Sequence, residues 1–178
     1  DQWVTAQREE LTAEVTARLE QYDIVGAARA LDQFILEDFS NWYVRRSRRR
    51  LQHPTSQDDG EAAALTMGYA LLGLTELMAP FTPFLAESVY QELRQKLGLP
   101  EESVHLRKWS PAAPRQIRGG SRLLVGMAEV RRLAALALAK RAEVGMRVRQ
   151  PLAKLKVKRL TLKVPQLLDV LRDEVNVK

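Results

Sequence analysis

The segment DFSNWYVRRSRRR, residues 38–50, changes character along its length. Read as a helix at about 100° per residue, it extends an apolar stripe that begins upstream and is formed by Ala28, Leu31, Ile35 and Trp42. In the same register, the stripe continues into Arg46 and Arg49. A face that is apolar at one end and cationic at the other is typical of a helix whose tip leaves its domain. We therefore predict one long helix over residues 24–51 with a cationic tip.

Arginines fill five of six consecutive positions at this tip: Arg45, Arg46, Arg48, Arg49 and Arg50. Guanidinium is always charged and binds phosphate through two parallel hydrogen bonds, so the tip is a candidate anion-binding surface. The alternative is a solvated helix end, because cations are favoured at the C-terminal pole of the helix dipole. Arg45 or Arg46 could also pair with Asp38 or Glu37 and fix the helix instead of binding a ligand.

The aromatic residues before the arginines divide between core and surface. Trp42 shares the face of Leu31 and Ile35, which favours a place in the core. Tyr43 points about 100° away from that face and is the better candidate for stacking on an unpaired base. Trp109 lies in a connector and is expected to anchor it on the bundle.

The charge of the 178-residue chain, +6 in total, is unevenly distributed. Residues 1–102 carry a net charge of −7, residues 103–163 carry +14 and residues 164–178 carry −1. A basic third of this kind favours a polyanionic partner, and nucleic acid is the commonest one. Within the acidic residues 1–102, the arginine tip is the one cluster of basic residues.

Apolar periodicity predicts helices at residues 5–21, 24–51, 61–79, 83–97 and 121–142. The last of these is expected to carry its basic residues on the outer face: Arg131, Arg132, Lys140 and Arg141. Strict alternation predicts a strand at residues 154–158, Thr161–Val164 is a candidate second strand, and Pro165 opens a short helix. The fold class is therefore mainly α. We expect an antiparallel helical bundle at residues 1–143 and a small α/β appendage at residues 144–178.

The composition of the chain excludes several kinds of site and partner. The chain has no cysteine, which excludes disulfides and thiolate metal sites and is compatible with the cytoplasm. It has no apolar run of the roughly 20 residues that span a bilayer, so no membrane partner is expected. His53 and His105 lack metal-ligand spacing, and no nucleophile has an adjacent base, so we predict no catalytic residue and no metal site. The chain opens inside a helical pattern and ends without a stop signal, as expected of a fragment.

Four segments occur together in an order known from one family: EDFSNWYVRRSRRR (37–50), LMAPFTPFLAESVYQEL (77–93), SVHLRKW (103–109) and GMRVRQPLAKLKV (145–157). In these segments, which lie within about residues 10–178, the chain resembles the anticodon-binding region of class Ia aminoacyl-tRNA synthetases. The SNWYVRRSR and RVRQPLAKL runs resemble the isoleucyl type most, with the valyl and leucyl types as alternatives. The APFTPFLAE element is shared across the class.

The resemblance implies a non-catalytic domain that holds the anticodon stem-loop of a tRNA. The family's HIGH- and KMSKS-type catalytic signatures are absent, so ATP and magnesium are expected in the catalytic domain of the same parent chain, which is the second expected partner. The expected RNA contacts are Tyr43, Arg45, Arg46, Arg49, Arg50, Arg147, Arg149, Lys154, Lys156 and Lys158. A general basic helical module for RNA, DNA or scaffolding is the alternative from another class, and an autonomous enzyme is disfavoured.

Overall fold

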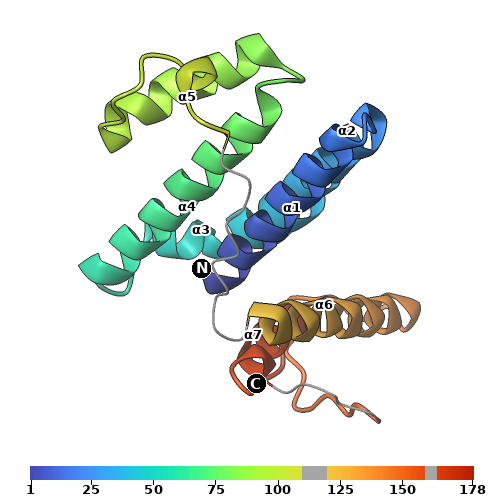
Figure 1. Cartoon of the computed structure of the whole chain (residues 1–178). Helices are drawn as coiled ribbons and strands as arrows, with labels where there is room; N and C mark the ends of the chain where they lie inside the picture. The colour runs from blue at the N-terminus through green and yellow to red at the C-terminus, as the bar shows by residue number, and fades with distance from the viewer. Residues whose placement is uncertain (110–119, 159–163) are drawn as a thin grey trace. The chain divides into compact units, whose positions relative to one another are not determined.

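The computed structural model describes residues 1–109, 120–158 and 164–178. The chain divides into two compact units, Asp1–Arg115 and Gln116–Lys178. The boundary expected at residue 143 does not coincide with this division, because the helix at residues 120–143 packs within the second unit. The predicted mainly helical fold is confirmed (Figure 1).

The first unit begins with the helical pair α1 (Gln2–Glu20) and α2 (Ile24–Gln33), which lie side by side (Figure 1). The turn between them is closed by Asp23, whose side chain accepts a hydrogen bond from the Gly26 amide at 2.9 Å and pairs with Arg18 at 2.7 Å. A Cβ at Gly26 would collide with the Asp23 carboxylate in this position, so glycine permits this cap. The inner face of α1 contributes buried Trp3, Val4, Leu11 and Val15.

The helical path continues without a break from α2 through the π-helical segment η1 (Phe34–Val44) into α3 (Arg45–Gln52). The single long helix predicted over residues 24–51 is therefore confirmed in its extent, but its π-helical middle was not predicted. Phe34 and Phe39 stack with ring centroids 6.3 Å apart, and Phe39 stacks on Tyr43 at 6.2 Å. Residues five apart lie on different faces of a regular α-helix, so the first pair reflects the wider π-helical turn.

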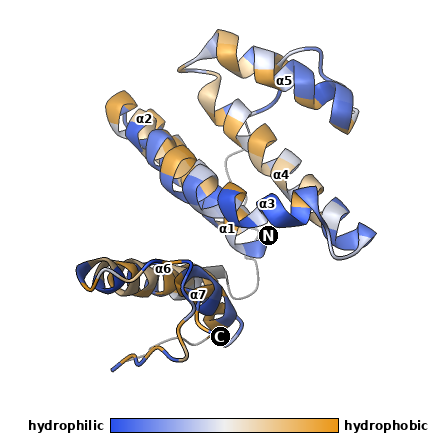
Figure 2. Ribbon diagram, turned by 180° about the vertical axis from the view of Figure 1, so that it is seen from behind, coloured by the Kyte–Doolittle hydropathy of each residue, from blue (hydrophilic) through white to orange (hydrophobic). Residues whose placement is uncertain are grey.

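Helices α4 (Gln57–Met78) and α5 (Pro83–Leu97) complete the first unit together with the short 3₁₀ turn η2 (Val104–Leu106). As predicted, Pro83 opens α5, and Gly98 ends it at a φ of 65°. The core between these elements is formed by Leu72, Ala86, Tyr90, Leu93 and Val104. Figure 2 shows the apolar character of α4 beside the hydrophilic α3. The predicted anchoring of Trp109 is confirmed by its Nε1 hydrogen bond to Thr16 Oγ1 on α1, at 3.1 Å.

In the second unit, α6 (Gly120–Glu143) packs on α7 (Leu167–Val175). The strand predicted at residues 154–158 does not form, and within the described residues the only β pairing in this unit is an isolated parallel bridge between Leu152 and Val177. Alternation alone does not make a strand, because a strand also needs a neighbour for its backbone hydrogen bonds. Most of the second candidate strand, residues 161–163, lies outside the described residues. The α/β character of the appendage is therefore not confirmed.

Arg141 is buried, with 3% of its surface exposed, although the sequence predicted an outer position. Its guanidinium donates to the carbonyl of Val175 at 3.3 Å and to the carbonyls of Arg147 and Gln150. The Val175 carbonyl lies at the C-terminal end of α7, where the helix dipole favours a cation. Arg141 therefore holds the turn after α6 against the end of α7 through main-chain atoms.

None of the helices in the described part of the chain has the length and apolarity that crossing a membrane requires.

We predict that Arg141→Met lowers the free energy of unfolding of the second unit by about 2–4 kcal/mol, because three carbonyls lose their donor. Hydrogen exchange of the α7 amides measures this change. The matched control is Lys140→Met: this neighbouring side chain is 76% exposed and pairs with Glu143, so a change within about 0.5 kcal/mol is expected. Equal effects of the two substitutions would contradict the anchoring role.

Candidate nucleic-acid interface

The π-helical segment η1 changes which side of the following helix faces inward. A regular register from Leu31 through Trp42 would point Arg46 and Arg49 inward, as the sequence stripe indicated. Instead, the buried positions run one residue later: Phe34, Phe39, Tyr43 and Ser47, with Trp42 also buried. Arg50, three residues after Ser47, is half-buried on the same side.

The five arginines of α3 lie at different angles around the helix from the buried Ser47. At about 100° per residue, Arg50 lies about 60° from Ser47, Arg46 and Arg48 lie about 100° away on its two flanks, and Arg45 and Arg49 lie about 160° away. In the structure the flank of Arg46 and Arg50 faces inward: these two residues are half-buried, and Arg45, Arg48 and Arg49 are exposed. The outward face of α3 is therefore formed by Arg45, Arg48 and Arg49.

Two arginines at the start of α3 gather around Trp42. The guanidinium carbons of Arg45 and Arg46 lie 5.8 and 5.6 Å from the centroid of its ring, within the range of cation–π attraction. Arg45 Nε also donates to the Asn41 carbonyl at 2.8 Å. The predicted core position of Trp42 is confirmed by its 9% exposure. Pairing of these arginines with Asp38 or Glu37 stays a prediction.

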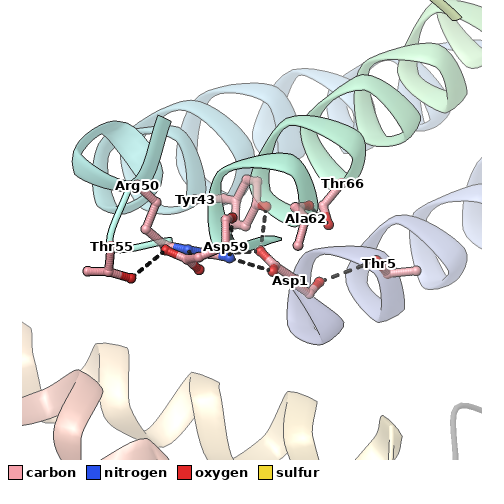
Figure 3. Close-up of polar contacts among 8 residues, drawn as sticks. All are labelled: Asp1, Thr5, Tyr43, Arg50, Thr55, Asp59, Ala62 and Thr66. Carbon is pink, nitrogen blue, oxygen red and sulfur yellow. Dashed lines mark hydrogen bonds and ion pairs between the residues drawn. The ribbon is translucent and has the colours of Figure 1, made fainter. Parts of the chain in front are cut away.

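Tyr43 lies in the interior and not at the surface where a base could stack on it. Its side chain is 5% exposed, and its hydroxyl donates to Asp1 Oδ1 at 2.8 Å (Figure 3). Burial raises the pKa of the Tyr43 phenol above its usual value, against the opposing effect of hydrogen bonding to Ser47 and of the nearby Arg50 charge. The expected stacking role of Tyr43 does not fit this packing, because the shifted register turns it inward.

Arg50 is also engaged within the protein. Its Nε donates to Asp59 Oδ1 at 2.7 Å, and its Nη1 and Nη2 donate to the two carboxylate oxygens of Asp1 at 2.8 and 3.0 Å (Figure 3). The guanidinium fork is occupied by carboxylates, so Arg50 does not fit the phosphate-binding role expected from the sequence. It joins the end of α3 to the first residues of α1 and α4.

Arg48 and Arg49 remain as the exposed cations of the last turns of α3. In the part of the chain that the structure describes, neither forms an ion pair with a carboxylate. Arg48 belongs to the arginine tip but was not among the RNA contacts expected from the sequence. The position of Ser47 does not separate Arg48 from Arg46 in the sequence, because both lie about 100° from it on the helix.

The second unit carries its own basic segment, and all five residues expected there are exposed: Arg147, Arg149, Lys154, Lys156 and Lys158. The backbone beneath the first two is fixed by Arg141 and by Asn176, whose Nδ2 donates to the carbonyls of Val148 and Arg149 at 3.0 and 3.1 Å. The side chains of Arg147 and Arg149 therefore extend into solvent from an anchored main chain. The described residues contain no group of three or more metal-binding side chains.

The sequence matches the family model of the anticodon-binding domain of tRNA ligase over residues 1–158, and the chain belongs to this family. Among similar curated proteins is the isoleucine--tRNA ligase of Thermus thermophilus, which is 44% identical over 154 residues, covering 85% of this chain and 14% of that protein. The isoleucine--tRNA ligase of Deinococcus radiodurans is 40% identical over 185 residues, covering 100% of this chain and 16% of that protein. The chain thus spans between one seventh and one sixth of the length of these relatives.

We predict that the buried phenol of Tyr43 makes the first unit sensitive to alkali. Because the folded pKa is raised, the unfolded chain releases the proton first, near the usual value of 10.0. This contribution to stability is therefore fully present below that pH and is lost as the pH rises above it. Thermal unfolding followed across the alkaline range measures the loss. Tyr43→Phe is expected to flatten this dependence, and parallel curves for the two proteins would contradict the prediction.

Proposed function

We propose that this chain binds the anticodon arm of a tRNA and that it does so as the anticodon-binding part of an isoleucine--tRNA ligase. The observation that carries the proposal is the outward arginine face of α3 in a chain of the anticodon-binding family. The 35–44% identity to isoleucine--tRNA ligases supports isoleucine over the valyl and leucyl alternatives. Ligation itself, with its need for ATP and magnesium, belongs to the catalytic domain of the longer protein, which we place in the cytoplasm.

The outward arginines supply the affinity in this proposal. Arg48 and Arg49 bind phosphates of the anticodon arm, and Arg45 adds a third positive charge on the same face. Each phosphate that is neutralised releases condensed counterions, so the affinity depends strongly on salt concentration. With Tyr43 inside the protein, the planar guanidinium groups are the groups on this face that can stack on an unpaired anticodon base.

The surrounding charge restricts where the RNA lies on the first unit. The first unit, residues 1–115, carries a net charge of −4 even though the five arginines of the tip belong to it. The rest of this unit therefore repels phosphate, and the tip is the place where a polyanion approaches favourably. The basic segment of the second unit provides further contacts with the RNA backbone, through Arg147, Arg149, Lys154, Lys156 and Lys158.

We predict that Arg48→Glu together with Arg49→Glu weakens binding of an anticodon stem-loop by a factor on the order of ten or more. The slope of log affinity against log salt concentration should also fall by roughly 1.5, because two phosphate contacts are lost. Fluorescence anisotropy at several salt concentrations measures both quantities.

A control with the same change in net charge separates a site from a general charge effect. Arg29 on α2 and Lys96 on α5 are exposed and lie outside α3. Changing both to Glu should reduce the affinity much less and leave the salt slope nearly unchanged. If both double variants weaken binding equally, the arginine face of α3 is not the binding site.

Anticodon reading distinguishes the proposed function from a general basic module. We predict that the chain binds an isoleucine-tRNA anticodon stem-loop more tightly than a stem-loop of equal length with an exchanged anticodon. Competition between the two RNAs at constant salt measures the difference. Equal and steeply salt-dependent binding would reduce the role of the chain to that of a clamp on the phosphate backbone.

A further inference from the structure

Helix α3 has little hydrophobic contact to hold it in place. Of its eight residues, five are arginines, and Ser47 is its buried residue. Arginines three and four positions apart repel each other along the helix, which lowers its own stability. Interactions with other segments must therefore fix the direction of its last turn, where Arg48 and Arg49 lie.

The ion-pair cluster of Arg50 with Asp1 and Asp59 supplies such an interaction (Figure 3). The three side chains are about one-third exposed, between 28 and 32%, so their attraction is only partly screened by water. Arg50 uses its Nε and both terminal nitrogens in this cluster, a geometry that allows little rotation of the guanidinium. The cluster thus fixes the end of α3 at the position of Arg50.

Asp59 is itself held by the start of α4. Its main-chain amide donates to the Ser56 Oγ at 3.2 Å, and the Thr55 hydroxyl donates to its Oδ2 at 3.4 Å. A carboxylate is also favoured in the first turn of a helix by the helix dipole. Asp59 is therefore a rigid support that reaches Arg50 from a different helix.

We infer that Asp59 is a positioning residue for RNA binding: through Arg50 it holds the last turn of α3 so that Arg48 and Arg49 are directed at the phosphates. This inference rests on the proposed function of the α3 face. It assigns to an acidic residue a favourable part in binding a polyanion, although Asp59 itself does not contact the RNA.

The sign of the effect makes the inference testable. Removing a negative charge near a phosphate-binding surface strengthens RNA binding if the charge acts only through its electrostatic field. If Asp59 instead positions α3, its removal weakens RNA binding. Asp58 offers a matched control, because it lies beside Asp59 in the first turn of α4, carries the same charge and is exposed.

The experiment compares Asp59→Asn with Asp58→Asn in anticodon stem-loop binding, at a temperature where circular dichroism shows both variants to be folded. We expect Asp59→Asn to weaken binding roughly fivefold and Asp58→Asn to leave it equal or slightly tighter. Arg50→Lys, which keeps the charge but loses the fork, should weaken binding as Asp59→Asn does and serves in its place if that variant does not fold. Binding by Asp59→Asn, or in that case by Arg50→Lys, that is equal to or tighter than that of Asp58→Asn would overturn the inference.

Hydrogen exchange without RNA separates failure of this inference from failure of the proposed function. Amides of residues 46–52 should exchange faster in Asp59→Asn than in Asp58→Asn. Unchanged exchange overturns the positioning role, whether or not RNA binds. If the unmodified chain binds no stem-loop, the proposed function fails, while faster exchange in Asp59→Asn still supports the control of α3 by Asp59.

Discussion

The π-helical register of η1 is the constraint on which the cationic tip depends. The π-helical winding of the 11 residues Phe34–Val44 moves the inward side of the following helix by about one residue. The aromatic rings of Phe34, Phe39 and Tyr43 then form one inner row, and Arg50 follows on the same side of the helix. The apolar packing of η1 therefore determines which guanidinium groups are exposed one turn later.

The arginines of α3 consequently divide into supporting and exposed groups, although they are chemically identical. Arg50 is neutralised by two carboxylates, and Arg46 lies over Trp42. Arg48 and Arg49 keep their charge at the surface. A run of like charges can remain helical in this arrangement because part of it is compensated by groups from other segments.

Much of the fold follows from the sequence, and the residues whose expected roles at the arginine tip did not fit share one physical cause. Proline and glycine signals gave the limits of α5, and periodicity gave the extent of the path from Ile24 to Gln52. The roles expected of Tyr43 and Arg50 do not fit the structure, because a regular helical period cannot reveal a π-helical segment. The strand at residues 154–158 was wrong for a related reason: a local pattern contains no information about the partner that the segment needs. The family itself was recognisable from short motifs.

The anchoring of the basic turn after α6 has a consequence for how this surface can change. Arg141 and Asn176 bind main-chain carbonyls of residues 147–150, not their side chains. A peptide carbonyl is present whatever residue occupies the position, so the shape of this turn does not depend on the identity of its exposed side chains. The exposed side chains of this turn, and with them its charge pattern, can therefore be exchanged by evolution or by design without a change in its backbone conformation.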